Sequence, residues 1–416
     1  MQNNPRERGA ILIMAAVSMF VLVAFSAIVV DYGILWTARG QAQNSADAGA
    51  LAGAIAIGKG QSNASSRETA SVIARLNSIW GETTDAADVI VSNLPYPCPA
   101  SAGGGTQGCI RVDVMRGAPD DTTAVHTNTL PVFFASMLGV AQQGVRATAT
   151  AQVTSGNSVN CIKPWGIADK WQDNSGTNQP GWDQWDSFNP GVDSYVPSSS
   201  SSTTGFTLAN DKGLQLALKG DHGSWLAGWS SEIQFPGATG SSDYEAAIVG
   251  CPSFIPEVGF YAGQPCDNAD DEDPARGCLR VKTGVSQGPT TQGVTTLVGT
   301  DDGAYWNGSE ILGSEFAESP RIVPIPLFDP ADFVVNQASS CSGSNCVIKV
   351  VNIMGFFVEG VCADVAAEGR LEATTYCADP NKDIVGRLVG YIGSSRGGAG
   401  NVPPGNGFIL VTRLVR

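Results

Sequence analysis

The chain has 416 residues and a formal net charge of −15, with 24 Lys and Arg against 39 Asp and Glu. The basic residues are scattered along the sequence, so no phosphate-binding surface is expected and nucleic acid is excluded as a partner. Frequent Gly and Pro, with only 15% charged residues, favour a β-rich extracytoplasmic protein over a helical cytosolic enzyme. The length allows two or three domains, each with its own core.

The first predicted element is an apolar segment over residues 10–30, which contains no charged residue. At about 1.5 Å per residue it extends about 31 Å, the thickness of the hydrocarbon core of a bilayer. Tyr32 and Trp36 follow it at the depth of the membrane interface. A cleavable signal peptide has a shorter apolar core, so we expect a retained transmembrane helix. A buried core helix is the alternative.

The flanking charges predict the orientation of this helix. Arg6 and Arg8 lie in the short segment 1–9 before it, and Asp31 follows it at once. Basic residues are enriched on the cytoplasmic side of membrane helices. We therefore expect a single-pass protein with residues 1–9 in the cytoplasm and everything after residue 30 outside it.

All ten cysteines lie after the apolar segment, as expected in an oxidising compartment. Spacing alone does not fix their connectivity. A zinc site is the alternative, but the chain has no C-x-x-C motif and only His126 and His222 as histidines, so no metal or cofactor is predicted. The expected disulfides are Cys98–Cys109, Cys161–Cys251, Cys266–Cys278, Cys341–Cys346 and Cys362–Cys377.

Small residues recur every four positions directly after the membrane segment. Positions four apart form one ridge of a helix, so this row gives the helix a smooth face. Two contacts suit such a face: close packing on the sheet of its own domain, or pairing with a helix of another subunit. The row consists of Ala38, Ala42, Ala46, Ala50, Ala54 and Gly58, with Gly49 and Gly53 beside it.

The order of motifs over residues 6–58 resembles the N-terminal segment of the TadE/TadG-like proteins of the tight-adherence (Flp-type) pilus system. The resemblance implies a bitopic bacterial inner-membrane protein, or a minor-pilin-like subunit, that binds other pilus or pilus-assembly subunits. The residues that carry it are Arg8-Gly9, the apolar segment, Asp31-x-Gly33, Arg39, Gln41 and Ala46-Asp47-Ala48-x-Ala50-Leu51-Ala52.

One position departs from the processed members of such systems. Type IV-like prepilins have Glu at the fifth position after the cleaved Gly. Here Gly9 is followed by Ala10, and the fifth position is Met14. The uncleaved TadG-like form therefore fits this sequence better than the TadE-like form.

The predicted fold class is α+β. Residues 31–154 are expected to form the continuing helix and a small α+β domain, and 155–160 a linker. Residues 161–416 are expected to form a disulfide-containing, β-rich, sandwich-like extracytoplasmic domain. The predicted elements are helices over 68–80 and 131–140, and strands over 89–92, 110–115, 145–153, 347–358, 384–392 and 408–415.

Two stretches of the second domain are candidate ligand sites. The loop between Cys266 and Cys278 gathers five carboxylates, which either bind calcium or are simply solvated; its spacing differs from that of an EF-hand. A Trp-rich segment follows Cys161 and either stacks on sugar rings or fills a core. The residues concerned are Asp267, Asp270, Asp271, Glu272 and Asp273 in the loop, and Trp165, Trp171, Trp182, Trp185, Trp225 and Trp229 in the segment.

No G-x-S-x-G motif and no phosphate-binding glycine loop in a strand–turn–helix context occurs in the sequence. The predicted function is therefore that of a non-enzymatic, membrane-anchored structural component of a Tad/Flp-type pilus assembly or secretion apparatus. It would contact membrane lipid and pilus subunits. The alternatives are a surface adhesin that binds a glycan through the Trp-rich segment, and an anchored extracytoplasmic hydrolase that uses His126 or His222.

Overall fold

The computed structural model divides the chain into two compact units. Unit 1 comprises residues 1–57, 61–153 and 412–416, and unit 2 comprises residues 58–60 and 154–411. The described residues are 5–99, 108–117, 129–140, 142–156, 159–174, 188–218, 231–235, 240–252, 277–282, 286–334, 347–375, 377, 379–392 and 406–415.

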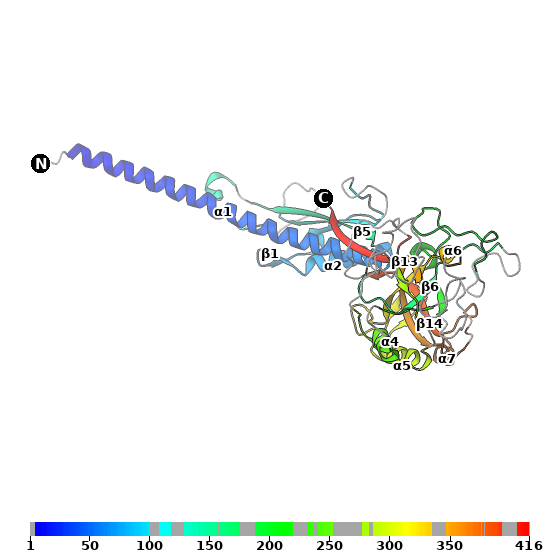
Figure 1. Ribbon diagram of the computed structural model, residues 1–416. Coiled ribbons are helices and arrows are strands. Elements are labelled where there is room, and N and C mark those ends of the chain that lie inside the picture. The colour runs from blue at the N-terminus through cyan, green and yellow to red at the C-terminus, as the bar shows by residue number, and fades with distance from the viewer. Residues whose placement is uncertain are drawn as a thin grey trace. The chain divides into compact units, whose positions relative to one another are not determined.

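Unit 1 begins with helix α1, Pro5–Gly58, one uninterrupted helix whose N-terminal half stands clear of the rest of this unit (Figure 1). The large apolar side chains from Ile11 to Val30 are 45–74% exposed. The helix is long and apolar enough to cross a membrane, and its most apolar stretch is not buried inside the protein. The alternative of a buried core helix is therefore wrong.

The rest of unit 1 is a small α+β domain. Its sheet runs in the order β16-β5-β4-β3, and β4 is antiparallel to both β3 and β5. The elements are α2 Asn63–Arg75, β1 Ser78–Ile79, β2 Glu82–Thr83, η1 Ala86–Asp88, β3 Val89–Val91, β4 Cys109–Arg116, η3 Ala135–Leu138, β5 Val145–Ser155 and β16 Ile409–Val415.

The predicted strands over 89–92, 110–115, 145–153 and 408–415 are confirmed. The helix predicted over 68–80 begins earlier, because Ser62 caps its N-terminus, and it ends at Arg75. The helix predicted over 131–140 is a single 3₁₀ turn. Residues 412–416 belong to unit 1, where β16 pairs with the edge that β5 would otherwise leave open.

Unit 2 is built on a seven-stranded sheet with the order β7-β14-β13-β12-β6-β8, to which β9 adds by pairing with β13. The strands of this sheet are β6 Trp165–Ala168, β7 Gln215–Leu218, β8 Ser231–Glu232, β9 Cys278–Arg280, β12 Ile322–Phe328, β13 Val347–Val361 and β14 Ile384–Val389. The remaining elements are α3 Leu208–Asp211, α4 Ser241–Val249, α5 Gln287–Gly299, β10 Tyr305–Trp306, β11 Ile311–Leu312, α6 Pro330–Asp332, α7 Cys362–Ala367 and β15 Tyr391–Ile392.

Helices, not a second sheet, cover the main core of this sheet. Val323, Ile325 and Leu327 alternate along β12 into the same buried cluster as Ile248 of α4 and Val294 of α5. The described part of unit 2 is thus a β-rich sheet with a layer of helices on it, within the predicted α+β fold class. Its apolar runs are buried strands, as predicted, but helical side chains fill the space above them.

Three predicted disulfides are present, Cys98–Cys109 in unit 1 and Cys161–Cys251 and Cys362–Cys377 in unit 2. Cys278 is also disulfide-bonded. Its expected partner Cys266, and the expected pair Cys341–Cys346, lie outside the described residues. None of the described cysteines is free.

Candidate functional site at the membrane exit of helix α1

Asp31, the first residue after the apolar segment, holds a loop that lies about 100 positions further along the chain. Its Oδ1 accepts the backbone N–H of Phe133 at 3.0 Å, and its Oδ2 accepts those of Phe134 and Ala135 at 2.9 and 2.5 Å. These donors lie at the start of the 3₁₀ turn η3, where the N–H groups have no partner within the turn. Asp31 is only 6% exposed.

The electrostatics of this contact favour the charged form of Asp31. Burial of the carboxyl group disfavours the charge, but the three backbone donors outweigh burial and place the pKa of Asp31 below its ordinary value of 3.8. The charge of Asp31 is therefore satisfied by the protein at the point where the helix leaves the membrane segment.

The small-residue row of α1 is buried in the core of unit 1. It belongs to one cluster with Ile110, Val112 and Val114 of β4 and with Ala70 and Ala74 of α2. A Cβ atom on Gly53 would lie 2.6 Å from Cδ1 of Ile110 and 2.9 Å from Cβ of Ala70, so only glycine fits there. The fully buried members of the row are Ala38, Ala42, Ala46, Ala50 and Ala54.

Polar side chains beside this row fasten the helix to three other segments of unit 1. Ser45 Oγ donates to the Ala74 carbonyl of α2 at 2.6 Å, and Gln43 Nε2 donates to the Thr148 carbonyl of β5 at 3.2 Å. Gln41 Oε1 accepts the backbone N–H of Trp80 at 2.7 Å. These bonds fix the rotation of α1 about its axis as well as its distance from the sheet.

The sequence left two contacts open for the small-residue row, and the structure contains the first of them. The row packs on the sheet and helix of its own domain. In this arrangement a membrane-length helix continues without a break into the core of a folded domain.

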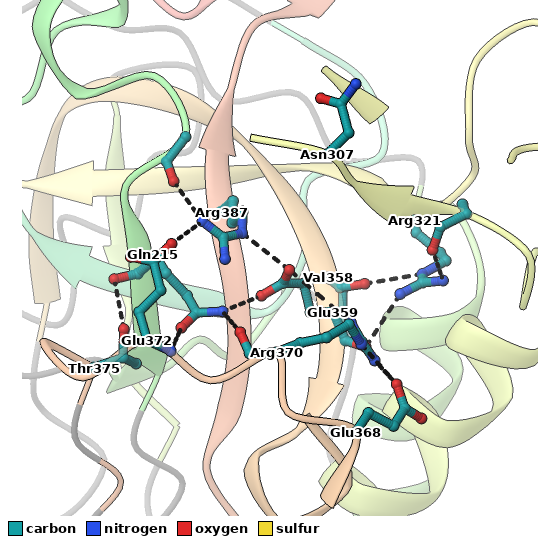
Figure 2. Close-up of polar contacts among 12 residues, drawn as sticks. Gln215, Asn307, Arg321, Val358, Glu359, Glu368, Arg370, Glu372, Thr375 and Arg387 are labelled. Atoms are coloured by element: carbon teal, nitrogen blue, oxygen red, sulfur yellow. Dashed lines mark hydrogen bonds and ion pairs between the residues drawn. The ribbon is translucent and has the colours of Figure 1, made fainter. Parts of the chain in front are cut away.

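Unit 2 contains a buried polar network centred on Glu359, which is 2% exposed (Figure 2). Its carboxylate pairs with Arg387 Nε at 2.9 Å and accepts a hydrogen bond from Gln215 Nε2. Gln215 and Arg387 are direct neighbours on the paired strands β7 and β14. Three adjacent strands therefore contribute one member each.

A β-bulge places Glu359 in this position. Val358 pairs with Gly386 and Gly360 with Val385, so Glu359 is the extra residue of β13. Gly360 has a φ of 152°, a conformation that side chains rarely tolerate. The bulge interrupts the regular hydrogen bonding between β13 and β14 and turns the Glu359 carboxylate toward Arg387.

The backbone carbonyls of the bulge accept hydrogen bonds from the side chain of Arg321, which is 1% exposed. Its guanidinium donates to the carbonyls of Val358 and Glu359 at 2.9 and 3.1 Å, and to those of Asp301 and Ala304 at 3.0 and 2.8 Å. Burial lowers the pKa of Arg321, with the nearby Arg370 acting in the same direction. Since every charge named here is engaged by protein groups, the network is suited to holding strands together.

A cavity of about 290 Å³ lies beside α4 in unit 2. Its lining includes Tyr244 and Lys282, and Lys282 Nζ already lies 3.3 Å from the Glu232 carboxylate. Burial raises the pKa of Glu232, and hydrogen bonds with Ser286 and Lys282 offset part of that effect. The cation that lines the cavity is thus paired with an anion from its own unit.

Most residues of the two predicted ligand sites lie outside the described part of the chain, and so do both histidines. They are Trp182, Trp185, Trp225 and Trp229 of the Trp-rich segment, the carboxylates from Asp267 to Asp273, and His126 and His222. Trp165 and Trp171 are 3% and 1% exposed, and Trp165 Nε1 donates to the Tyr244 hydroxyl at 3.0 Å. These two indoles therefore fill the core. Within the described ranges no three His, Cys, Asp or Glu side chains are grouped as metal ligands.

An exposed apolar helix that enters a disulfide-bonded α+β fold is the architecture of a membrane-anchored protein. Residues 9–56 match the family described as putative Flp pilus-assembly TadE/G-like. The matched segment is the part of α1 described above, from the membrane segment to the buried small-residue row, and it confirms the resemblance seen in the sequence. No curated protein and no solved structure matches the chain.

Proposed function

We propose that this protein is a non-enzymatic, membrane-anchored structural component of a Flp-type pilus assembly apparatus. One observation carries the proposal: the segment that matches the pilus-assembly family coincides with a helix whose first half is exposed and apolar and whose second half is the core of unit 1. A helix built in this way would hold the folded domain at a fixed distance and orientation relative to the membrane.

Continuity of α1 is the mechanical basis of this role. From Asp31 to Gly58 the helix extends about 40 Å, at about 1.5 Å per residue. Its buried face and its hydrogen bonds to α2 and β5 oppose rotation and sliding. The partners would be other pilus-assembly subunits, which contact the exposed apolar half of α1 within the bilayer or the outer surfaces of the two units.

The proposed location is the bacterial inner membrane, crossed once, with residues 1–9 in the cytoplasm. Arg6 and Arg8 on the short N-terminal side support this orientation. The three described disulfides support an oxidising compartment for both units. Asp31 lies at the outer end of the membrane segment, where its bonds to the loop at Phe133 keep it in unit 1.

The test is to separate producing cells into sheared surface fibres and inner membrane, and to identify the N-terminal peptide of the chain by mass spectrometry. We expect an intact N-terminus, including the residues before Gly9, in the membrane fraction. A chain that begins at Ala10 in the fibre fraction would contradict the anchoring role and indicate a processed minor pilin.

A deletion strain tests the assembly role separately. Loss of the gene should abolish or strongly reduce pili, and the intact gene should restore them. Complementation with Gly49→Leu should fail, because leucine cannot fit between α1 and α2, whereas Gly40→Leu should restore pili, because nothing lies within 4 Å of a Cβ at that position. Normal piliation without the protein would overturn the proposal.

A further inference from the structure

The loop over residues 131–140 is unusually apolar for a connection between two strands of a sheet. Its sequence is Pro-Val-Phe-Phe-Ala-Ser-Met-Leu-Gly-Val, and no charged residue occurs between Thr129 and Val145. Phe133 is 59% exposed and Val140 is 44% exposed. This uncharged loop therefore presents two large apolar side chains to its surroundings.

The backbone of the loop is closed on itself. At its base Leu130 donates to the Gln143 carbonyl at 3.0 Å, and Gln143 Nε2 donates to the Pro131 carbonyl at 2.7 Å. At its tip Gly139 donates to Ser136, and Val140 to Ala135, each at 3.1 Å. A segment can approach lipid at a lower cost when its backbone N–H and C=O groups are hydrogen-bonded within the segment, because lipid offers them no partners.

Asp31 fixes the level of this loop along α1. Its carboxylate binds the backbone at Phe133, Phe134 and Ala135, so the loop lies beside the helix where the apolar segment ends, as Figure 1 shows next to the α1 label. Tyr32 and Trp36 are 61% and 69% exposed on the same stretch of helix. Aromatic residues at this depth are typical of the membrane interface.

We propose that loop 131–140 is a second membrane contact, which lies in the interfacial layer of the phospholipid bilayer that α1 crosses. The inference rests on the proposed anchoring of α1. A lipid surface is the occupant that fits best, because Asp31 holds the loop at the end of the exposed apolar span and the loop carries no charge that a protein partner would match. Apolar side chains bury about 5–10 Å into this layer.

This second contact gives Asp31 a defined role. A single helix can tilt and rotate in a bilayer, whereas a helix with a laterally attached interfacial loop has its rotation restricted. The carboxylate of Asp31 joins the two membrane-facing elements, and the three backbone donors stabilise its negative charge at the membrane edge. The loop thereby sets the angle at which unit 1 leaves the membrane.

The experiment uses the full-length chain reconstituted in vesicles of phosphatidylethanolamine and phosphatidylglycerol. The photo-crosslinking residue p-benzoylphenylalanine replaces Phe133 in one variant, Phe20 of the apolar span in a second, and Ile90 of β3 in a third. Phe20 is 72% exposed and Ile90 is 43% exposed. Lipid adducts on each peptide are quantified by mass spectrometry after irradiation.

We expect lipid adducts at Phe20 and at Phe133, each several-fold above the yield at Ile90. Adducts at Phe20 but not at Phe133, or capture of Phe133 by a second protein chain only, would overturn the loop proposal and leave the anchoring intact. Absence of lipid at Phe20 would overturn the anchoring, and the loop proposal with it.

Two further variants keep the test decisive. A reporter at Val140 replaces the one at Phe133 if the latter variant fails to form the Cys98–Cys109 disulfide. The substitution Asp31→Ala in the Phe133 reporter should lower the lipid yield there several-fold and leave the yield at Phe20 unchanged. An unchanged yield at Phe133 would overturn the role given to Asp31.

Discussion

Gly49 on α1 and Ala70 on α2 approach so closely that a methyl group on Gly49 would lie 2.8 Å from the Ala70 carbonyl oxygen. The same methyl group would also lie 2.8 Å from Cβ of Ala74. Neither atom belongs to a flexible side chain that could move aside, so the two helices would have to separate. The distance between α1 and α2 is therefore set by the absence of a side chain at this position.

The substitution Gly49→Ala should destabilise unit 1 by about 1–3 kcal/mol, the usual effect of overpacking a core. Gly40→Ala on the same helix is the matched control, because nothing lies within 4 Å of its Cβ. It should stabilise the helix by about 0.5–1 kcal/mol through helix propensity. Amide hydrogen exchange of α2 in the full chain measures both effects. Equal exchange rates in the two variants would contradict a close contact between α1 and α2.

The sequence predicted the smooth face of α1 and two possible contacts for it, but not which residues cover it. A four-residue spacing defines a ridge, whereas the residues that meet it, such as Ala70 and Ile110, come from later segments whose placement depends on the whole fold. The return of β16 to the sheet of unit 1 is non-local in the same sense. Alternation along β5 was readable because it depends only on neighbouring residues.

Two features of the sites had no signal in the sequence. The bond from Asp31 to the loop at Phe133 joins residues 102 positions apart. The Glu359 bulge depends on the register between β13 and β14, which no local pattern specifies. The sequence did identify Asp31 as a charge at the end of the span, and it identified 131–140 as a separate element.

Protonation of Asp31 should release the loop that it holds. Because its pKa is lowered in the folded state, this group stabilises the contact above its ordinary pKa of 3.8, and the stabilisation is lost as the pH falls through the lower folded value. Asp31→Asn should therefore accelerate amide exchange at Phe133, Phe134 and Ala135 at neutral pH. Hydrogen exchange by mass spectrometry measures this directly.

The control for that experiment is Asp47→Asn on the same helix. Asp47 accepts a hydrogen bond from Gln43 one turn away, at 2.8 Å. Exchange in loop 131–140 should not change in this variant. If the loop exchanged equally fast in both variants, its attachment would depend on the stability of α1 in general and not on the Asp31 carboxylate.

Removal of one charge from the Glu359–Arg387 pair should destabilise unit 2 strongly. Glu359→Met leaves the guanidinium of Arg387, which is 6% exposed, with only the half-exposed carboxylate of Glu372 as an ion-pair partner. Removal of one partner from a buried pair costs about 3–5 kcal/mol, and the pairing with Glu372 should keep the loss at the lower end of that range. The double variant with Arg387→Met should be more stable than Glu359→Met alone, because it leaves no buried guanidinium that depends on the half-exposed Glu372 alone. Urea unfolding of the full chain, followed by tryptophan fluorescence, measures both.

The matched control for this pair is Asp379→Asn, which breaks the more exposed ion pair between Asp379 and Lys382 at 2.7 Å. Water solvates exposed charges nearly as well as an ion pair does, so the free energy of unfolding should be nearly unchanged. A double variant no more stable than Glu359→Met would show that the network stabilises unit 2 by packing and not by charge compensation.

Asp169 should make unit 2 less stable as the pH rises from about 4 to about 7. The residue is fully buried, and burial, with a further contribution from Asp329, raises its pKa from 3.8 to about 7 although Phe206, Tyr195 and Lys170 donate hydrogen bonds to it. The folded state therefore binds a proton that the unfolded state has already lost in this range, and the free energy of unfolding falls by a few kcal/mol, on the order of 1.4 kcal/mol per unit of pKa shift.

The substitution Asp169→Asn removes the titrating group and should flatten this pH dependence, with the largest gain in stability above pH 7. Its amide oxygen can still accept the backbone N–H groups of Phe206 and Lys170, so the local fold should persist. Urea unfolding at a series of pH values tests this, with the exposed Asp302→Asn as a control that should keep the parental slope. A slope that survives in Asp169→Asn would assign the pH dependence to another buried group.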